Sequence, residues 1–123
     1  MVEERIEDGK RIAQLLASEV DGREDGVLDR LTVIDANREV EGSVHGERAY
    51  RIARDGEPVA TVYVHEDRTR IEFRVGIDAA ADAALDAGLR TRPKAVDPPR
   101  TLVFVESGAA VKRAVDVIQT AVA

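Results

Sequence analysis

The sequence predicts an α+β fold, a two-layer sandwich in which helices cover one face of a mainly antiparallel sheet. Strand-like segments follow one another with short turn signals between them, and segments with helical periodicity stand near both ends of the chain. The chain has 123 residues, of which 44% are apolar, and this suits one hydrophobic core. We therefore expect a single α+β domain over residues 1–123, in the order helix, four strands, helix, strand, helix.

Three segments place apolar residues at the spacing of an amphipathic helix, and each has a signal for its start or its end. Gly22 and Gly26 follow the first segment and favour a left-handed helix end. Asp78 and Ser107 precede the second and third segments, and both residue types are good N-caps. The expected helices are residues 5–21, 79–87 and about 109–122.

Strand character is found in five further segments. The dipeptide Asp55-Gly56 between two of them is a hairpin signal, because both central positions of the favoured turn need a positive φ. The continuous apolar run at 102–105 is typical of a strand inside a sheet, covered on both faces. Residues 90–100 are rich in proline and are predicted to form a loop. The expected strands are residues 28–36, 48–54, 59–65, 70–75 and 102–105.

The turns determine which residues share a face of the sheet. With Asp55-Gly56 as a two-residue loop and 66–69 as a four-residue turn, one face is apolar and the other holds both tyrosines with several arginines. This second face has three interpretations: an ordinary solvated surface, a self-association surface, or a stacking platform for single-stranded nucleic acid. A contiguous apolar patch needs a partner, so we expect a homodimer through it. The residues predicted to form this tyrosine–arginine face are Arg48, Tyr50, Ile52, Tyr63, Arg70 and Arg74.

A second candidate surface is the basic segment 90–113, which holds six basic residues against two acidic ones in a chain of net charge −6. Where its apolar strand leads into the last helix, backbone N–H groups at the helix start favour an anion. Solvated helix faces, and cations placed beyond a helix C-terminus, explain the same charges without a ligand. The residues predicted to bind an anion are Arg100, Ser107, Gly108, Lys112 and Arg113.

The composition excludes several classes of chemistry. The chain has no cysteine, so disulfides, thiolate catalysis and cysteine-ligated zinc are excluded. His45 and His65 stand in different turns without metal-ligand spacing, and no serine has the context of a nucleophile elbow. We therefore expect no catalytic constellation, no cofactor and no metal site. A charged start and the lack of a long apolar run favour a cytoplasmic protein without a membrane partner.

Lysine is rare among the basic residues. Only Lys10, Lys94 and Lys112 are lysines among 18 basic residues, while Arg, Asp, Glu, Ala and Val dominate the chain. In this usage the whole chain resembles uncharacterised small haloarchaeal proteins, although a GC-rich genome also favours arginine and alanine over lysine. The resemblance implies a cytoplasm of molar salt and no known activity.

Two hypotheses of function follow from these surfaces. The first is a non-catalytic interaction protein that is homodimeric through the tyrosine–arginine face. The alternative is a small anion-, nucleotide- or nucleic-acid-binding module that uses the basic segment 90–113. The negative net charge argues against nucleic acid as a partner, because an acidic protein repels phosphate at long range.

Overall fold

The computed structural model describes residues 8–22 and 30–122, and within them the predicted α+β fold class is confirmed. Six strands form one antiparallel sheet with the order β1-β2-β3-β4-β6-β5. The elements in chain order are α1 (Gly9–Gly22), β1 (Leu31–Ile34), β2 (Glu47–Arg54), β3 (Glu57–Val64), β4 (Thr69–Phe73), α2 (Ile77–Asp86), β5 (Thr91–Lys94), β6 (Arg100–Val105), the 3-10 turn η2 (Gly108–Ala110) and α3 (Val111–Val122).

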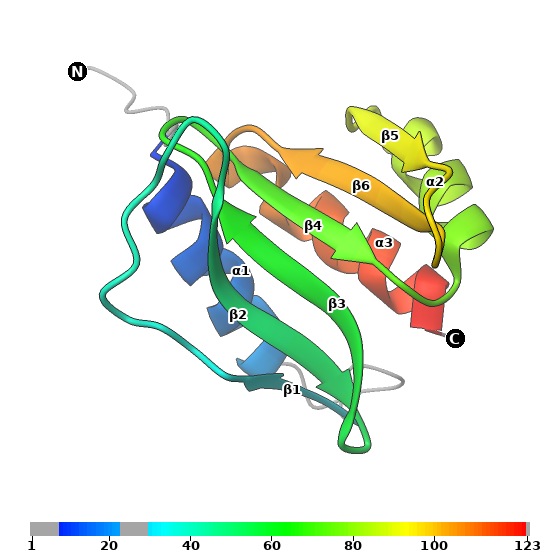
Figure 1. The fold of residues 1–123 in the computed structure, drawn as a ribbon, viewed down its shortest axis with the longest axis horizontal. Helices are drawn as coiled ribbons and strands as arrows, with labels where there is room; N and C mark the ends of the chain where they lie inside the picture. Colours follow the sequence, from blue (N-terminus) through cyan, green and yellow to red (C-terminus); the bar gives the residue numbers. More distant parts are fainter. Residues whose placement is uncertain (1–7, 23–29, 123) are drawn as a thin grey trace.

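The helices lie on one side of the sheet and leave its other side open (Figure 1). Helix α1 crosses behind the β1–β4 half, and α3 packs between α1 and α2 and against β6. The core fills the space between the two layers and consists mainly of branched aliphatic side chains. Its largest fully buried members are Phe73, Ile12, Leu16, Ile52, Ile71 and Ile118.

The apolar run at 102–105 does lie inside the sheet, because β6 is hydrogen-bonded between β4 and β5. The prediction of a loop over 90–100 was wrong in part, since residues Thr91–Lys94 form the edge strand β5. Pro93 pairs with Thr101 on β6 and has no strand on its other side. An edge strand tolerates proline because the missing N–H is not needed by a second neighbour.

Two of the predicted helix starts are displaced. Helix α2 begins at Ile77 with Gly76 at its N-cap, so Asp78 lies in the first turn, where a carboxylate favours the helix dipole. Ser107 occupies the N-cap position of η2, but its side chain makes no capping hydrogen bond. Instead its carbonyl oxygen accepts the N–H of Ala110 at 3.1 Å. The predicted start of the first helix, at residue 5, lies outside the described residues, but Asp8 is described and is not helical, so α1 begins at Gly9.

The hairpin at Asp55-Gly56 has the predicted turn, with φ of 49° and 86° at the two residues and Arg54 opposite Glu57. Beyond the turn, the predicted register of β2 against β3 was wrong. Val59 on β3 and Ala49 on β2 have no partner, as in β-bulges.

The Val59 bulge changes which side of the sheet the residues of β2 face. Ile52 lies opposite Ala60 rather than Val59, and Tyr50 opposite Val62 rather than Thr61. Both side chains therefore point toward the helices and are buried, with exposed fractions of 0% and 5%. The pairing of β3 with β4 differs from the predicted one by two residues, since Val64 lies opposite Thr69 instead of Ile71. A shift by an even number of residues leaves each side chain of these strands on its predicted face.

Candidate functional site

The side of the sheet that faces away from the helices, here called the outer face, concentrates positive charge. It carries half of the 18 lysines and arginines of a chain whose net charge is −6. Cross-strand pairing assembles them, since Arg70 lies between Tyr63 on β3 and Phe104 on β6, and Leu102 lies opposite Arg92 on β5. The cations of the outer face are Arg48, Arg51, Arg68, Arg70, Arg74, Arg90, Arg92, Lys94 and Arg100.

Two aromatic rings on the outer face are stacked with guanidinium groups. The Arg70 guanidinium lies 4.3 Å from the centre of the Tyr63 ring. Phe104 has Arg68 at 5.5 Å and Arg90 at 6.0 Å from its ring centre. Both rings are half-buried by these contacts. Cation–π attraction thus keeps these guanidinium groups close to the aromatic rings, and planar guanidinium and aromatic groups are both surfaces on which a nucleobase can stack.

One carboxylate lies inside the outer face, and it is enclosed by cations. The side chain of Glu72 is 8% exposed, and its Oε1 accepts a hydrogen bond from Arg100 Nη1 at 3.1 Å. Arg70 Nε lies 3.0 Å from Glu72 Oε2 as an ion pair without a hydrogen bond. Glu72 therefore neutralises charge that would otherwise be buried and adds little negative potential at the surface.

His65 fixes the Arg70 side chain from beside the outer face. Its Nε2 lies 3.0 Å from Arg70 Nη1, and its Nδ1 lies 3.0 Å from the carbonyl oxygen of Val44. Arginine can only donate, so Nε2 accepts and Nδ1–H donates, which requires a neutral ring. Burial lowers the pKa of His65, and the nearby charges of Arg70 and Arg68 lower it further, against the opposing effect of the Val44 hydrogen bond.

Several cations of the outer face remain available to a ligand. Arg51 pairs with Asp35, and Arg90 lies 3.5 Å from Glu106. Four exposed cations make no ion pair with any residue in the described ranges: Arg48, Arg74, Arg92 and Lys94. The outer face thus has spare positive charge on both sides of its aromatic centre.

The structure divides the two predicted surfaces differently from the sequence analysis. Of the tyrosine–arginine face, Arg48, Tyr63, Arg70 and Arg74 lie together on the outer face, whereas Tyr50 and Ile52 belong to the core. The outer face therefore lacks two of the residues, Tyr50 and Ile52, on which the expected homodimer depended.

The basic segment 90–113 is split between two places. Arg100 joins the outer face together with Arg90, Arg92 and Lys94. The other predicted anion-binding residues follow β6 and lie on η2, α3 and the turn before them. There Arg113 Nη1 donates to the carbonyl oxygen of Ala87 at 2.8 Å, and the Lys112 side chain is exposed. Arg100 therefore shares no site with Ser107, Gly108, Lys112 and Arg113.

Phe104 was not singled out from the sequence, because its apolar run was expected to be covered on both faces. In this run only Val103 and Val105 face the helices, whereas Leu102 and Phe104 face outward, and Arg68 and Arg90 lie over the Phe104 ring. Alternation along the strand was the available signal, since adjacent residues of a strand point to opposite faces.

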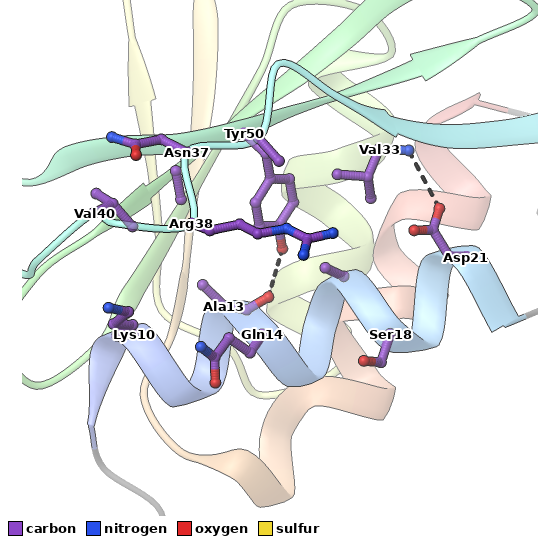
Figure 2. A pocket seen from close by; sticks show the side chains of 13 residues that line it. Lys10, Ala13, Gln14, Ser18, Asp21, Val33, Asn37, Arg38, Val40 and Tyr50 are labelled. Atoms are coloured by element: carbon purple, nitrogen blue, oxygen red, sulfur yellow. Dashed lines mark hydrogen bonds between the residues drawn. The ribbon is translucent and has the colours of Figure 1, made fainter.

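A cavity of about 450 Å³ lies on the other side of the sheet, between α1 and the segment that leads from β1 to β2 (Figure 2). Tyr50 closes it from the sheet, and its hydroxyl donates to the carbonyl oxygen of Ala13 at 2.8 Å. Asp21 Oδ1 accepts the backbone N–H of Val33 at 3.3 Å at one end of the cavity. Lys10 stands at the other end and pairs with Glu41 at 3.0 Å.

Neither of these sites has the donor set of a metal centre. Over residues 8–22 and 30–122, no group of three or more His, Cys, Asp or Glu residues is placed to hold a metal ion. None of the helices in the described part of the chain is long and apolar enough to span a bilayer.

The fold and the outer face define a small α+β protein with one open, basic sheet surface. The chain belongs to a family of unknown function, DUF7993, which matches residues 1–123. No curated protein and no solved structure matches it.

Proposed function

We propose that the protein is a non-catalytic binding module whose outer face holds single-stranded nucleic acid. The observation that supports this most directly is the segregation of charge, since half of the lysines and arginines of an acidic chain share one open sheet face with two aromatic rings. Single strands are bound by cationic grooves together with aromatic or guanidinium planes on which bases stack.

The parts of the face have separate tasks in this proposal. The four unpaired cations contact phosphates along the strand. The Tyr63–Arg70 stack and the arginine-flanked Phe104 offer flat surfaces to roughly two or three bases, the number that sheet platforms of this kind accommodate. A single strand is favoured over a duplex, because only unpaired bases can turn their flat faces to the sheet.

Acidic residues near the outer face and the negative net charge both oppose the binding of nucleic acid, but neither places a free carboxylate among the aromatic rings. Glu72 is enclosed by Arg70 and Arg100, and Glu57 stands at the tip of the β2–β3 hairpin rather than among the aromatic rings. The net charge of −6 resides mainly on the other surfaces, so a ligand that approaches the outer face meets cations.

A homodimer through the outer face is less well supported than it was by the sequence alone. A two-fold axis would bring identical basic faces together, and like charges across an interface oppose association. Tyr50 and Ile52, which supplied much of the apolar character, are buried in each copy.

The proposed setting is a cytoplasm of high salt, which is supported by the acidic, lysine-poor composition. At about 1 M salt the screening length is roughly 3 Å, so attraction acts only at contact. Under that condition stacking and direct arginine–phosphate hydrogen bonds must provide most of the affinity. Binding is therefore to be measured both at low and at molar KCl.

The test is fluorescence anisotropy with labelled single-stranded RNA and DNA, a duplex, and an acidic peptide. The double variant Arg92→Gln/Lys94→Gln is compared with Arg11→Gln/Lys112→Gln, which removes the same charge from helices α1 and α3. We expect the first pair to weaken single-strand binding at least tenfold at low salt and to reduce the slope of log K against log salt by about 1.4, or about 0.7 per lost phosphate contact. The control pair leaves the affinity within about twofold of the parent value and leaves the slope of log K against log salt unchanged.

Three results would contradict the proposal. One is the absence of single-strand binding at low salt, and another is an equal loss of affinity in the two double variants. The third is tighter binding of the acidic peptide than of any oligonucleotide, which would assign the face to an acidic protein partner. Light scattering in the same buffers identifies a dimer, and a dimer abolished only by Arg92→Gln/Lys94→Gln would favour self-association instead.

A further inference from the structure

The cavity of Figure 2 lies on the helix side of the sheet and shares no residue with the outer face. Helix α1 forms one wall, and β1, the loop after it and the start of β2 form the other. A volume of about 450 Å³ is within the range of small-molecule sites. Any ligand held here would bind independently of the proposed nucleic-acid surface.

Two opposite charges on the cavity walls, those of Arg38 and Asp21, are exposed and keep hydrogen-bonding groups that no described residue occupies. The ammonium group of Lys10 is paired with Glu41, so it contributes little net charge. Arg38 makes no ion pair within the described parts of the chain. Asp21 uses Oδ1 for the N–H of Val33, and its Oδ2 accepts no hydrogen bond from a described residue. Figure 2 shows the Arg38 side chain running along the cavity toward the end where Asp21 lies.

The surface between these charges is largely apolar. Ala17, Val33, Val40 and Ala49 contribute aliphatic groups, and the Tyr50 ring is held in place by the hydrogen bond from its hydroxyl to Ala13. Burial raises the pKa of Tyr50, and the charge of Asp21 raises it further, so the phenol stays neutral.

We propose that this cavity binds a small zwitterion with an apolar body, of which a free aliphatic α-amino acid is the simplest form. Arg38 receives the carboxylate of the ligand, and Asp21 Oδ2 receives its ammonium group. Ser18, Gln14 and Asn37 line the same cavity and offer neutral hydrogen-bonding groups. The apolar walls take up the aliphatic side chain, as in most small-molecule sites, where a few polar groups orient the ligand.

A chemical comparison separates a zwitterion from a simple anion. L-leucine is titrated by calorimetry beside 4-methylpentanoate, which lacks the ammonium group, and 3-methylbutylamine, which lacks the carboxylate. We expect leucine to bind and each analogue to bind at least tenfold more weakly, because the loss of a hydrogen bond to a charged group lowers affinity by about that factor or more. Backbone NMR shifts on leucine addition should concentrate at residues 17–18 and 37–38.

The matched variants are Arg38→Gln, Asp21→Asn and the control Asp116→Asn on α3. Asparagine keeps the oxygen that accepts the Val33 N–H, so Asp21→Asn removes charge and leaves the local structure in place. It should weaken leucine about tenfold while leaving 4-methylpentanoate unchanged, whereas Arg38→Gln should weaken both. Asp116→Asn should alter neither.

The proposal would be overturned by 4-methylpentanoate binding as tightly as leucine, which would describe a plain anion pocket. It would also be overturned by an equal effect of Asp21→Asn on both ligands. Absence of leucine binding at about 10 mM would overturn it as well, because a site with a millimolar Kd would be mostly occupied at that concentration. Arg92→Gln/Lys94→Gln changes no residue of the cavity, so its effect on oligonucleotide binding and the result of the leucine titration are independent of each other.

Discussion

Substitution of Gly76 tests a close backbone contact between α3 and the start of α2. Gly76 is the N-cap of α2, with φ of 56° and ψ of 35°. A Cβ atom added there would lie 2.0 Å from the carbonyl oxygen of Ala121 on α3 and 2.8 Å from its carbonyl carbon. Neither neighbour can rotate away, because both are backbone atoms of a helix. Gly76→Ala therefore forces α2 and α3 apart.

Gly56 provides the matched control. It also has a positive φ, of 86°, but an added Cβ meets nothing within 4 Å. The left-handed conformation costs an L-residue about 1–2 kcal/mol at either position. At Gly76 the steric overlap adds about 1–3 kcal/mol, as in other overpacked sites. We expect the free energy of unfolding to fall by about 2–5 kcal/mol in Gly76→Ala and by about 1–2 kcal/mol in Gly56→Ala.

Urea unfolding followed by far-UV circular dichroism at constant salt measures both variants. The midpoint should fall further for Gly76→Ala than for Gly56→Ala, with the same m-value in the two proteins. Thermal melts should agree, at roughly 3–5 °C for each kcal/mol in a chain of this length. Equal midpoints in the two variants would refute the reasoning, because they would mean that α2 and α3 do not touch at Gly76.

Three further predictions concern polar groups. The pKa of His65 is lowered in the folded protein, so as pH falls through about 6.5 the unfolded chain takes up a proton first and the free energy of unfolding declines, by at most about 1.4 kcal/mol per pH unit. In His65→Gln the urea midpoint should therefore depend less on pH between 7.5 and 5.5 than in the parent, and an equally steep dependence would exclude this histidine as the cause. Glu72→Gln leaves two partly buried arginines without their carboxylate and should lower the unfolding free energy by about 1–3 kcal/mol, with a smaller loss at molar KCl; a loss that is independent of salt would argue against a charge effect. Tyr50→Phe removes the hydrogen bond to Ala13 and should cost about 1 kcal/mol in urea unfolding, and an unchanged midpoint would mean that the Tyr50–Ala13 bond adds nothing to stability.

Local chemistry allowed some parts of the fold to be predicted from the sequence. Asp55-Gly56 determines its turn because few other dipeptides accept positive φ at both positions. The run at 102–105 had to be inside the sheet because an edge strand of that hydrophobicity would be exposed. The strand β5 was missed because its proline argues against a strand. At the edge of the sheet, however, the missing N–H of Pro93 costs no hydrogen bond to a second neighbouring strand.

The outer face was harder to predict because it depends on long-range register. A strict alternation assigns Tyr50 to the same side as Tyr63, and the unpaired residue Val59 reverses that assignment without any local signal. The net charge of −6 was equally uninformative about the face, because a sum over the chain hides how the charges are distributed in space. Only the pairing of β4, β6 and β5 brings Arg92 and Arg100 onto the same face of the sheet as Arg70.

The two bulges between β2 and β3 make this hairpin unequally tolerant of changes in length. Ala49 and Val59 have no partner in the β2–β3 pairing, so loss of either residue would leave every β2–β3 pair in place. Each loss would remove one backbone bond elsewhere, from the N–H of Asn37 to Ala49 or from the N–H of Arg74 to Val59. Loss of Arg51, which is paired with Thr61, would instead move Tyr50 to the outer face and draw Ala49 into its place. Within DUF7993, single-residue deletions in this hairpin should therefore fall at the positions of Ala49 and Val59, while the residues between them keep a constant number.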